Sequence, residues 1–236
     1  MEEKKETLEK MTFLDHLDEL RKRIMYALIA VVIGACIAAF FWKPILDILM
    51  RPAGDIELHY LNVLEPFMAK VKLSIFSGVL VAFPIIIFQF LMFLAPALKT
   101  KEKKQIYPLV FFLVILFFSG VVFGYFYIMP VGTKWLIDQA GDKMVSILSI
   151  SQYLSYAWLF LLGFGLSFET PIFIWVLSKL GIVTTKSLIR NWRYAIIIIL
   201  IASAILTPDW SPVTMALFSA PMFVLYLFSI LLIKVF

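Results

Sequence analysis

The chain has 236 residues, of which 62% are hydrophobic and 16% charged, and its mean hydropathy is +0.96. Soluble domains are only about 45–50% apolar, so this composition excludes an ordinary soluble domain and predicts an integral membrane protein. The net charge of +5 does not require a nucleic-acid partner, because lysine and arginine beside apolar spans usually set membrane topology.

The N-terminal segment, at about residues 7–22, carries apolar residues every three or four positions among charged ones. This spacing predicts an amphipathic helix, which we expect to lie on the membrane surface and to turn into the bilayer at Arg21-Lys-Arg23. The segment lacks the apolar core and the cleavage site of a signal peptide. The first span is therefore expected to serve as the signal.

Three apolar spans follow at about residues 24–42, 73–94 and 107–129, each close to the roughly 20 residues that cross a bilayer. The connection between the first two contains Pro44, Pro52 and Pro66 and is too irregular for lipid, so we expect it to form a structured cap at one surface. Gly120 and Gly124 lie in the third span. Their spacing of four predicts close helix packing.

The fourth span, at about residues 153–179, is interrupted by Glu169 and Pro171. Insertion scales put an aspartate at a helix centre at a cost of about 2.5–3.5 kcal/mol, so Glu169 should face protein or water, or be protonated. Pro171 cannot donate a hydrogen bond to the Ser167 carbonyl, which loosens the helix beside the acid. This polar notch is a candidate site.

The last two spans are unusual in other ways. The fifth, at about residues 194–206, would be only about 20 Å long as a helix, against a hydrocarbon core of about 30 Å. The sixth, at about residues 213–233, contains Pro221. Two short or broken spans together predict local thinning of the bilayer or cover by partner proteins.

Lysine and arginine residues are unevenly divided between the two membrane faces that six spans would define. Fifteen lie on the side of the N-terminus and six on the other side. Because positive charge is retained in the cytoplasm, both termini are predicted to be cytoplasmic. The predicted fold is an all-α integral membrane protein, a single domain over residues 1–236, with six transmembrane helices and structured extracytoplasmic loops.

Two sets of polar residues could carry chemistry. Gln89 and Glu169 are expected near mid-span, where they satisfy one another or backbone carbonyls, line a groove for a docking or passing segment, or move protons. On the cytoplasmic side, Asp18, Glu19 and Glu102 stand out among basic residues. Carboxylates accept bidentate bonds from guanidinium groups, which suits an arginine-bearing ligand. Pairing along one helix is the alternative, Asp18 with Lys22 and Glu19 with Arg23.

Enzyme motifs are mostly absent. The chain contains no G-x-x-x-x-G-K-[ST] nucleotide-binding motif, and Gly165-Leu-Ser167 lacks the closing glycine of a serine-hydrolase elbow. The single cysteine, Cys36, and the two histidines, which lie outside the spans, predict no metal or other cofactor. We therefore do not expect an enzyme.

Four motifs, taken in order, resemble those of one family. They are Leu17-Asp-Glu-Leu-Arg-Lys-Arg23, Phe93-Leu-Ala-Pro-Ala-Leu98 followed by Glu102, Gly165-Leu-Ser-Phe-Glu-Thr-Pro171, and Leu206-Thr-Pro208. This set resembles TatC, the receptor subunit of twin-arginine protein translocases, over essentially the whole chain. The resemblance implies a receptor in the bacterial cytoplasmic (inner) membrane that binds twin-arginine signal peptides of folded precursors. It would work in a multimeric complex with TatA and TatB-type single-span subunits, using the proton-motive force.

The resemblance also implies roles for individual positions. The signal-recognition surface on the cytoplasmic face would contain Glu19, Leu20, Arg21, Phe93 and Glu102. The membrane-embedded polar positions would be Gln89 and Glu169, and the short last two spans would contact TatA and TatB. Functional positions of the outer cap would be Pro52, Glu65, Pro66 and Phe67.

One stretch departs from the family pattern. After Leu206-Thr-Pro208 the family usually has a second proline before its aspartate, whereas here Asp209 follows directly and is the nearest candidate for that acid. Two rival functions stay open on the sequence alone. One is a proton-coupled small-solute transporter with Glu169 as the carrier. The other is a passive scaffold that binds partner helices without binding peptides.

Overall fold

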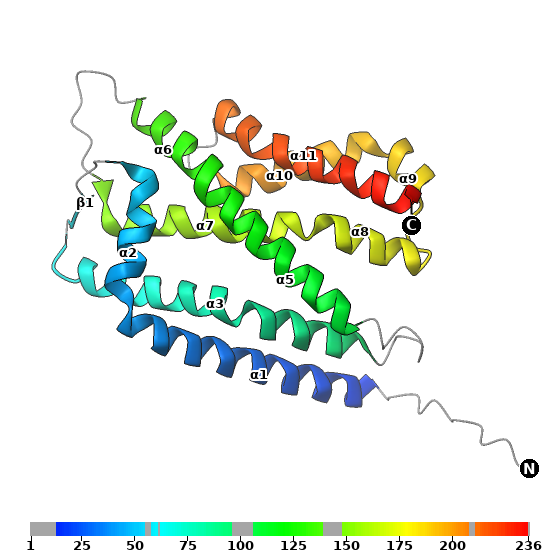
Figure 1. Cartoon of the computed structure of the whole chain (residues 1–236), viewed down its shortest axis with the longest axis horizontal. Coiled ribbons are helices and arrows are strands. Elements are labelled where there is room, and N and C mark those ends of the chain that lie inside the picture. The colour runs from blue at the N-terminus through cyan, green and yellow to red at the C-terminus, as the bar shows by residue number, and fades with distance from the viewer. Residues whose placement is uncertain are drawn as a thin grey trace, which may run out of the picture.

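A computed structural model of the chain describes residues 13–54, 58–60, 62–95, 106–138, 148–207 and 211–235. The protein is an all-α membrane protein (Figure 1). The elements are α1 (Phe13–Phe40), α2 (Trp42–Met50), η1 (Arg51–Ala53), β1 (Leu58–His59), α3 (Glu65–Leu94), α5 (Ile106–Phe123), the π-helical turn η3 (Gly124–Ile128), α6 (Met129–Asp138), β2 (Leu148–Ser149), α7 (Ile150–Phe168), α8 (Thr170–Lys179), α9 (Thr185–Arg190), α10 (Trp192–Leu206) and α11 (Pro212–Val235).

Within these ranges, five helical stretches are long and apolar enough to cross a membrane. They are Asp15–Phe40, Glu65–Leu94, Ile106–Asp138, Ile150–Lys179 and Pro212–Lys234. The apolar helix α10, with 15 residues, is shorter. At roughly 1.5 Å per residue it extends about 22 Å, less than the hydrocarbon core of about 30 Å.

The helices pack as neighbours in a bundle (Figure 1). Helix α1 lies beside α3, α5 crosses α7, and α11 packs on α8 and α10. The beginning of α1, the end of α3 and the end of α11 lie at the same end of the bundle, which we call the N-terminal end. Helix α2 and strand β1 lie at the other end, which we call the α2 end.

Two close crossings depend on glycine. A Cβ atom on Gly78 would lie 2.5 Å from the Ala35 backbone nitrogen, so α1 and α3 could not approach as they do with a larger residue there. A Cβ atom on Gly120 would lie 2.5 Å from the Phe164 carbonyl oxygen, where α5 crosses α7. Close backbone approach through small residues is the usual way to pack helices in lipid. The packing role predicted for Gly120 is confirmed.

The first helix differs from its prediction. Helix α1 runs without a break through residues 21–23, so the expected turn into the bilayer is wrong for the described residues. Residues before and within this stretch pack on α3: the His16 ring stacks on Phe93 with ring centroids 4.4 Å apart, and Arg23 donates a hydrogen bond to Gln89. These contacts attach the first turns of α1 to α3, and no proline or glycine interrupts the helix between Phe13 and Arg23.

The connection expected to be a structured cap, too irregular for lipid, contains much regular structure. Pro44 is the third residue of α2 and Pro66 the second residue of α3. Proline lacks an N–H, and the first turn of a helix does not use that donor, so these prolines lie where helices begin. Helix α3 therefore starts eight residues before the predicted span. The two-residue strands β1 and β2 pair in parallel, Leu58 with Leu148 and His59 with Ser149.

Candidate functional site

A polar cluster of Glu19, Arg23 and Gln89 lies between α1 and α3 at the N-terminal end; we call it the Arg23 cluster. The Arg23 Nε and Nη2 atoms each lie 2.6 Å from Glu19 Oε1, and Nη1 donates to Gln89 Oε1 at 2.9 Å. Both contacts to Glu19 use Oε1, and among the described residues Oε2 accepts no hydrogen bond. The cluster therefore presents a positioned carboxylate with one oxygen still able to accept.

The surroundings of the cluster are amphipathic. Leu20 and Phe93 are half-buried, while Arg21 is exposed. Phe93 carries the stacked ring of His16. Glu102, predicted to belong to the same surface, lies outside the described residues.

One alternative from the sequence is confirmed and another is wrong. Glu19 does pair with Arg23 along the helix. Gln89 does not bind Glu169, because its side-chain oxygen accepts from Arg23 on another helix. Nor does Gln89 lie at mid-span: α3 extends from Glu65 to Leu94, so Gln89 is only five residues from its end. Helix α3 begins before the predicted span of residues 73–94, so its midpoint lies closer to the α2 end than the sequence predicted.

Glu169 occupies the break between α7 and α8. Pro171 provides no N–H for the Ser167 carbonyl, so the α-helix pauses at Glu169 and resumes with Ile172 and Phe173 N–H bonds to the Glu169 carbonyl, at 3.1 and 3.0 Å. The Glu169 side chain is only 1% exposed. Neither of its carboxylate oxygens has a hydrogen-bond partner among the described residues.

An aromatic contact joins the two places. Phe90 follows Gln89 on α3, and its ring meets that of Phe173 on α8 edge-on, with centroids 6.4 Å apart. Phe173 lies one helical turn beyond Glu169. The Arg23 cluster and the Glu169 notch are therefore linked through a direct contact between α3 and α8.

At the α2 end, Glu65 holds two elements together. Its carboxylate is buried and accepts hydrogen bonds from the Ser149 hydroxyl and, at 3.2 Å, from the Ser151 backbone N–H. These bonds fix the start of α3 to the start of α7. Its neighbour Phe67 is 61% exposed and therefore available for contact with other molecules.

The other predicted positions of this end are less informative. Pro66 is exposed beside Glu65, and Pro52 is half-buried in η1. Asp209 lies outside the described residues.

The hydroxyl groups of Tyr125 and Tyr153 donate to the Ile48 and Leu49 carbonyls, both at 2.6 Å. These two bonds tie the end of α2 to the bundle, and the sequence pattern did not indicate them.

The family model for the Sec-independent protein translocase protein TatC matches residues 15–221. The chain belongs to the TatC family. The Sec-independent protein translocase protein TatC of Carboxydothermus hydrogenoformans is 39% identical over 226 residues, which are 95% of this chain and 93% of that protein. The Aquifex aeolicus protein of the same name is 35% identical over 230 residues, covering 95% of each chain.

Solved structures agree with this assignment. A crystal structure of the twin-arginine translocase receptor TatC superposes with a TM-score of 0.82 at 35% identity, over 93% of this chain and 98% of that one. Membership of the TatC family makes this a multi-pass membrane protein of protein translocation and not an enzyme. Membership of the family supports a function in protein translocation, and no finding favours the alternative of a proton-coupled solute transporter.

Proposed function

We propose that this chain is the signal-peptide receptor of a twin-arginine translocase, with the Arg23 cluster and Phe93 as part of its binding surface. The observation that carries this proposal is the Glu19 carboxylate, which Arg23 holds by Oε1 while Oε2 accepts no hydrogen bond from the described residues. A guanidinium group of the signal peptide would bind Oε2 by charge-assisted hydrogen bonds. Phe93 would offer a neighbouring apolar surface for the rest of the peptide.

The recognition surface would include residues beside the cluster. Leu20 and Arg21 lie on the same stretch of α1 as Glu19, and Glu102 would add a second carboxylate for the second arginine. Two arginines would then meet two acids. This arrangement explains why a pair of arginines, rather than one, would identify the cargo.

Partner subunits would bind at the Glu169 notch. A buried carboxylate that lacks a hydrogen-bond partner is costly, so a donor side chain on a single-span TatA or TatB-type helix would gain a strong interaction there once the packing around the 1% exposed Glu169 opens to admit it. The short helix α10 and local thinning of the bilayer would help such a helix approach. The outer-cap positions Pro52, Glu65, Pro66, Phe67 and Asp209 would act on the opposite side of the membrane, in a multimeric complex that uses the proton-motive force.

The topology belongs to the same proposal. Counting α10 as a span gives six, with both termini in the cytoplasm of a bacterium and the N-terminal end of the bundle facing inward. The lysine and arginine distribution supports this orientation. Cysteines introduced singly at Lys22 and Lys134, exposed residues at opposite ends, in a Cys36→Ser background should be labelled by an impermeant reagent from opposite sides of inner-membrane vesicles. Labelling of both from the same side would refute it.

Replacing Glu19 with glutamine tests the recognition proposal. Loss of one charge-assisted hydrogen bond costs about 1.5–3 kcal/mol, so the affinity for a twin-arginine peptide should fall by at least about tenfold, and binding should depend less on salt. The measurement is titration of a fluorescent twin-arginine peptide into the purified, membrane-reconstituted protein.

The matched control for this experiment is Asp18→Asn. Asp18 is the adjacent, exposed carboxylate and forms no salt bridge with Lys22 within the described part of the chain. It should leave affinity nearly unchanged. Equal affinities for the parent and both variants would remove the carboxylate-recognition idea. Absence of any peptide binding by the parent, with partner helices still bound, would indicate a scaffold instead.

A further inference from the structure

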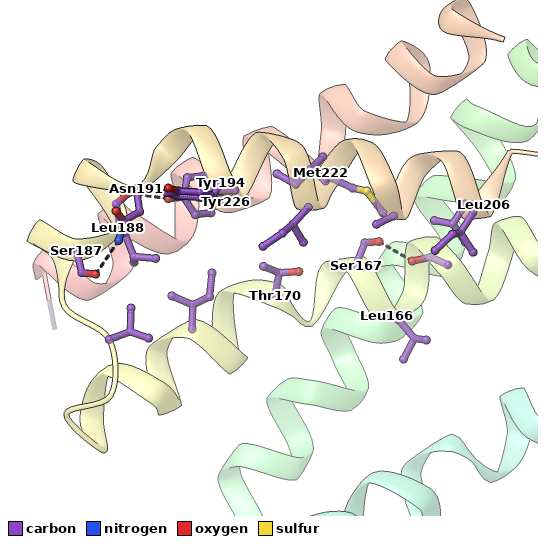
Figure 2. A pocket seen from close by; sticks show the side chains of 18 residues that line it. Leu166, Ser167, Thr170, Ser187, Leu188, Asn191, Tyr194, Leu206, Met222 and Tyr226 are labelled. Atoms are coloured by element: carbon purple, nitrogen blue, oxygen red, sulfur yellow. Dashed lines mark hydrogen bonds between the residues drawn. The ribbon is translucent and has the colours of Figure 1, made fainter. Parts of the chain in front are cut away.

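A cavity of about 680 Å³ lies between α7, α8, α9, α10 and α11 (Figure 2). Its interior is mostly apolar, with Ile174, Ile198, Ala202 and Met222, and two small polar side chains, Ser167 and Thr170, also line it. None of the individual positions named above for signal-peptide or partner recognition lines it, although α10 and α11, which the family resemblance assigns to partner contact, form part of its wall.

Polar side chains gather at the α9 end of this cavity. Figure 2 shows Ser187, Asn191 and Tyr226 close together there. Asn191 Nδ2 donates to Ser187 Oγ at 3.3 Å, and the Tyr226 hydroxyl donates to the Leu188 carbonyl at 2.9 Å. The cavity thus has a polar mouth and an apolar length, which is the pattern of an amphiphilic ligand rather than of a uniformly apolar one.

The same end carries unbalanced positive charge. Lys186 and Arg190, on α9, and Arg193, at the start of α10, are all exposed and lie beside the lining residues Ser187 and Asn191 in the chain, but do not themselves line the cavity. They form no salt bridge within the described residues. The sequence explains why: from residue 179 to the C-terminus the only acidic residue is Asp209, which follows the opposite end of α10.

We propose that this cavity binds an anionic phospholipid, with one acyl chain along α10 and the phosphate among Lys186, Arg190 and Arg193. The length of α10 suits an acyl chain: the helix extends about 22 Å, and an acyl chain spans one leaflet of the hydrocarbon core, which is about 15 Å thick. The charge fits, because a basic group at the membrane surface attracts anionic headgroups.

The size argues against a partner helix inside this cavity. A helix of about 10–12 Å diameter and 5.4 Å pitch occupies roughly 400–600 Å³ per turn. The cavity of about 680 Å³ would enclose little more than one turn of such a helix, so a partner helix could lie along it but not inside it, whereas a flexible acyl chain could enter. The bound lipid would fill the space between α8 and the short α10, and so join the last two spans to the bundle.

Native mass spectrometry of the purified, full-length chain tests this proposal. The probes are dioleoyl phosphatidylglycerol, which is anionic, and dioleoyl phosphatidylcholine, which has the same acyl chains and no net charge. One phosphatidylglycerol molecule should bind each chain at least about tenfold more tightly than phosphatidylcholine. Replacing Lys186, Arg190 and Arg193 together with glutamine should remove about a hundredfold of that affinity, at about 1 kcal/mol for each charge near the surface.

The matched control replaces three exposed cations at or near the α2 end, Lys43, Arg51 and Lys134, with glutamine and should change nothing. A second variant, Ala202→Phe, fills the cavity and should weaken both lipids, because each places an acyl chain there. The charge variant changes only exposed side chains, so it remains informative if Ala202→Phe does not fold. Equal binding of the two lipids, or no effect of the charge variant, would overturn the proposal. A second outcome would also overturn the lipid proposal. If a single-span partner peptide displaces phosphatidylglycerol from the parent chain, and Ala202→Phe prevents that peptide from binding, the cavity is a site for a helix.

Discussion

Replacing Glu169 with methionine removes a buried carboxylate and keeps an unbranched side chain of similar length. The parent side chain is 1% exposed, and its oxygens have no hydrogen-bond partner among the described residues. Removing a buried polar group without a partner should recover about 1–3 kcal/mol. The change of shape should cost less than about 1.5 kcal/mol, as volume-conserving apolar exchanges usually do. From the middle of these two ranges, we expect the free energy of unfolding to rise by about 1 kcal/mol.

The assay is reversible unfolding of the purified chain by increasing SDS in mixed micelles, followed by circular dichroism. The control is Ser203→Ala. Ser203 is also fully buried, but its hydroxyl donates to the Leu200 carbonyl at 2.8 Å, so its removal should give no gain in stability. Export of a twin-arginine precursor, measured in cells, should be lost with Glu169→Met and partly kept with Glu169→Gln, since an amide can still bind a donor.

A decrease in stability on Glu169→Met, with little effect of Ser203→Ala, would refute the reasoning. It would mean that the carboxylate makes a stabilising contact within this chain. A variant that is both more stable and fully active would separate Glu169 from function altogether. The expected combination, a more stable and less active protein, is the known signature of a group kept for function at a cost in stability.

The remaining predictions concern the crossing of α1 with α3 and the α2 end of the bundle. Gly78→Ala should lower the free energy of unfolding by about 1–3 kcal/mol because the added Cβ would lie 2.5 Å from the Ala35 nitrogen; Val81→Ile, which adds one methylene at a side chain that is 63% exposed, should be neutral in the same SDS titration. If Gly78→Ala and Val81→Ile changed stability equally, the close contact between α1 and α3 would not be at Gly78. Glu65→Ala should cost about 1–3 kcal/mol through lost bonds to the start of α7, measured by thermal unfolding in detergent. Phe67→Ala should leave the midpoint temperature of thermal unfolding unchanged, because the side chain is 61% exposed. A loss of stability as large as that of Glu65→Ala would show that the Phe67 ring packs against the protein.

Several features of this protein follow from local chemistry and were predictable. Lipid offers no hydrogen-bond partners, so a span must be a continuous apolar helix, and such runs are visible in a single sequence. The helix interruption at Glu169 and Pro171 was equally visible, since it depends on a missing N–H one turn away. The pairing of Glu19 with Arg23 could be named in advance because residues four apart on a helix are neighbours.

Other features needed the tertiary structure. Gln89 binds Arg23 across 66 residues, and no spacing rule could choose that partner over Glu169. The stacking of His16 with Phe93 likewise joins residues far apart in the chain, so no local rule could select it. Pro44 and Pro66 were misread as marks of irregular chain, because proline is compatible with both a loop and the first turn of a helix.

The sequence by itself determined that this chain enters a membrane, where most of its spans lie, and which acid interrupts them. Those properties depend on the transfer of short segments from water to lipid, and each segment carries its own cost. The tertiary structure decided what the polar groups do: Arg23 positions one carboxylate, Glu65 fixes two helices, and Glu169 is left without a partner among the described residues. Such pairings join residues far apart in the chain, so they are set by how the helices pack.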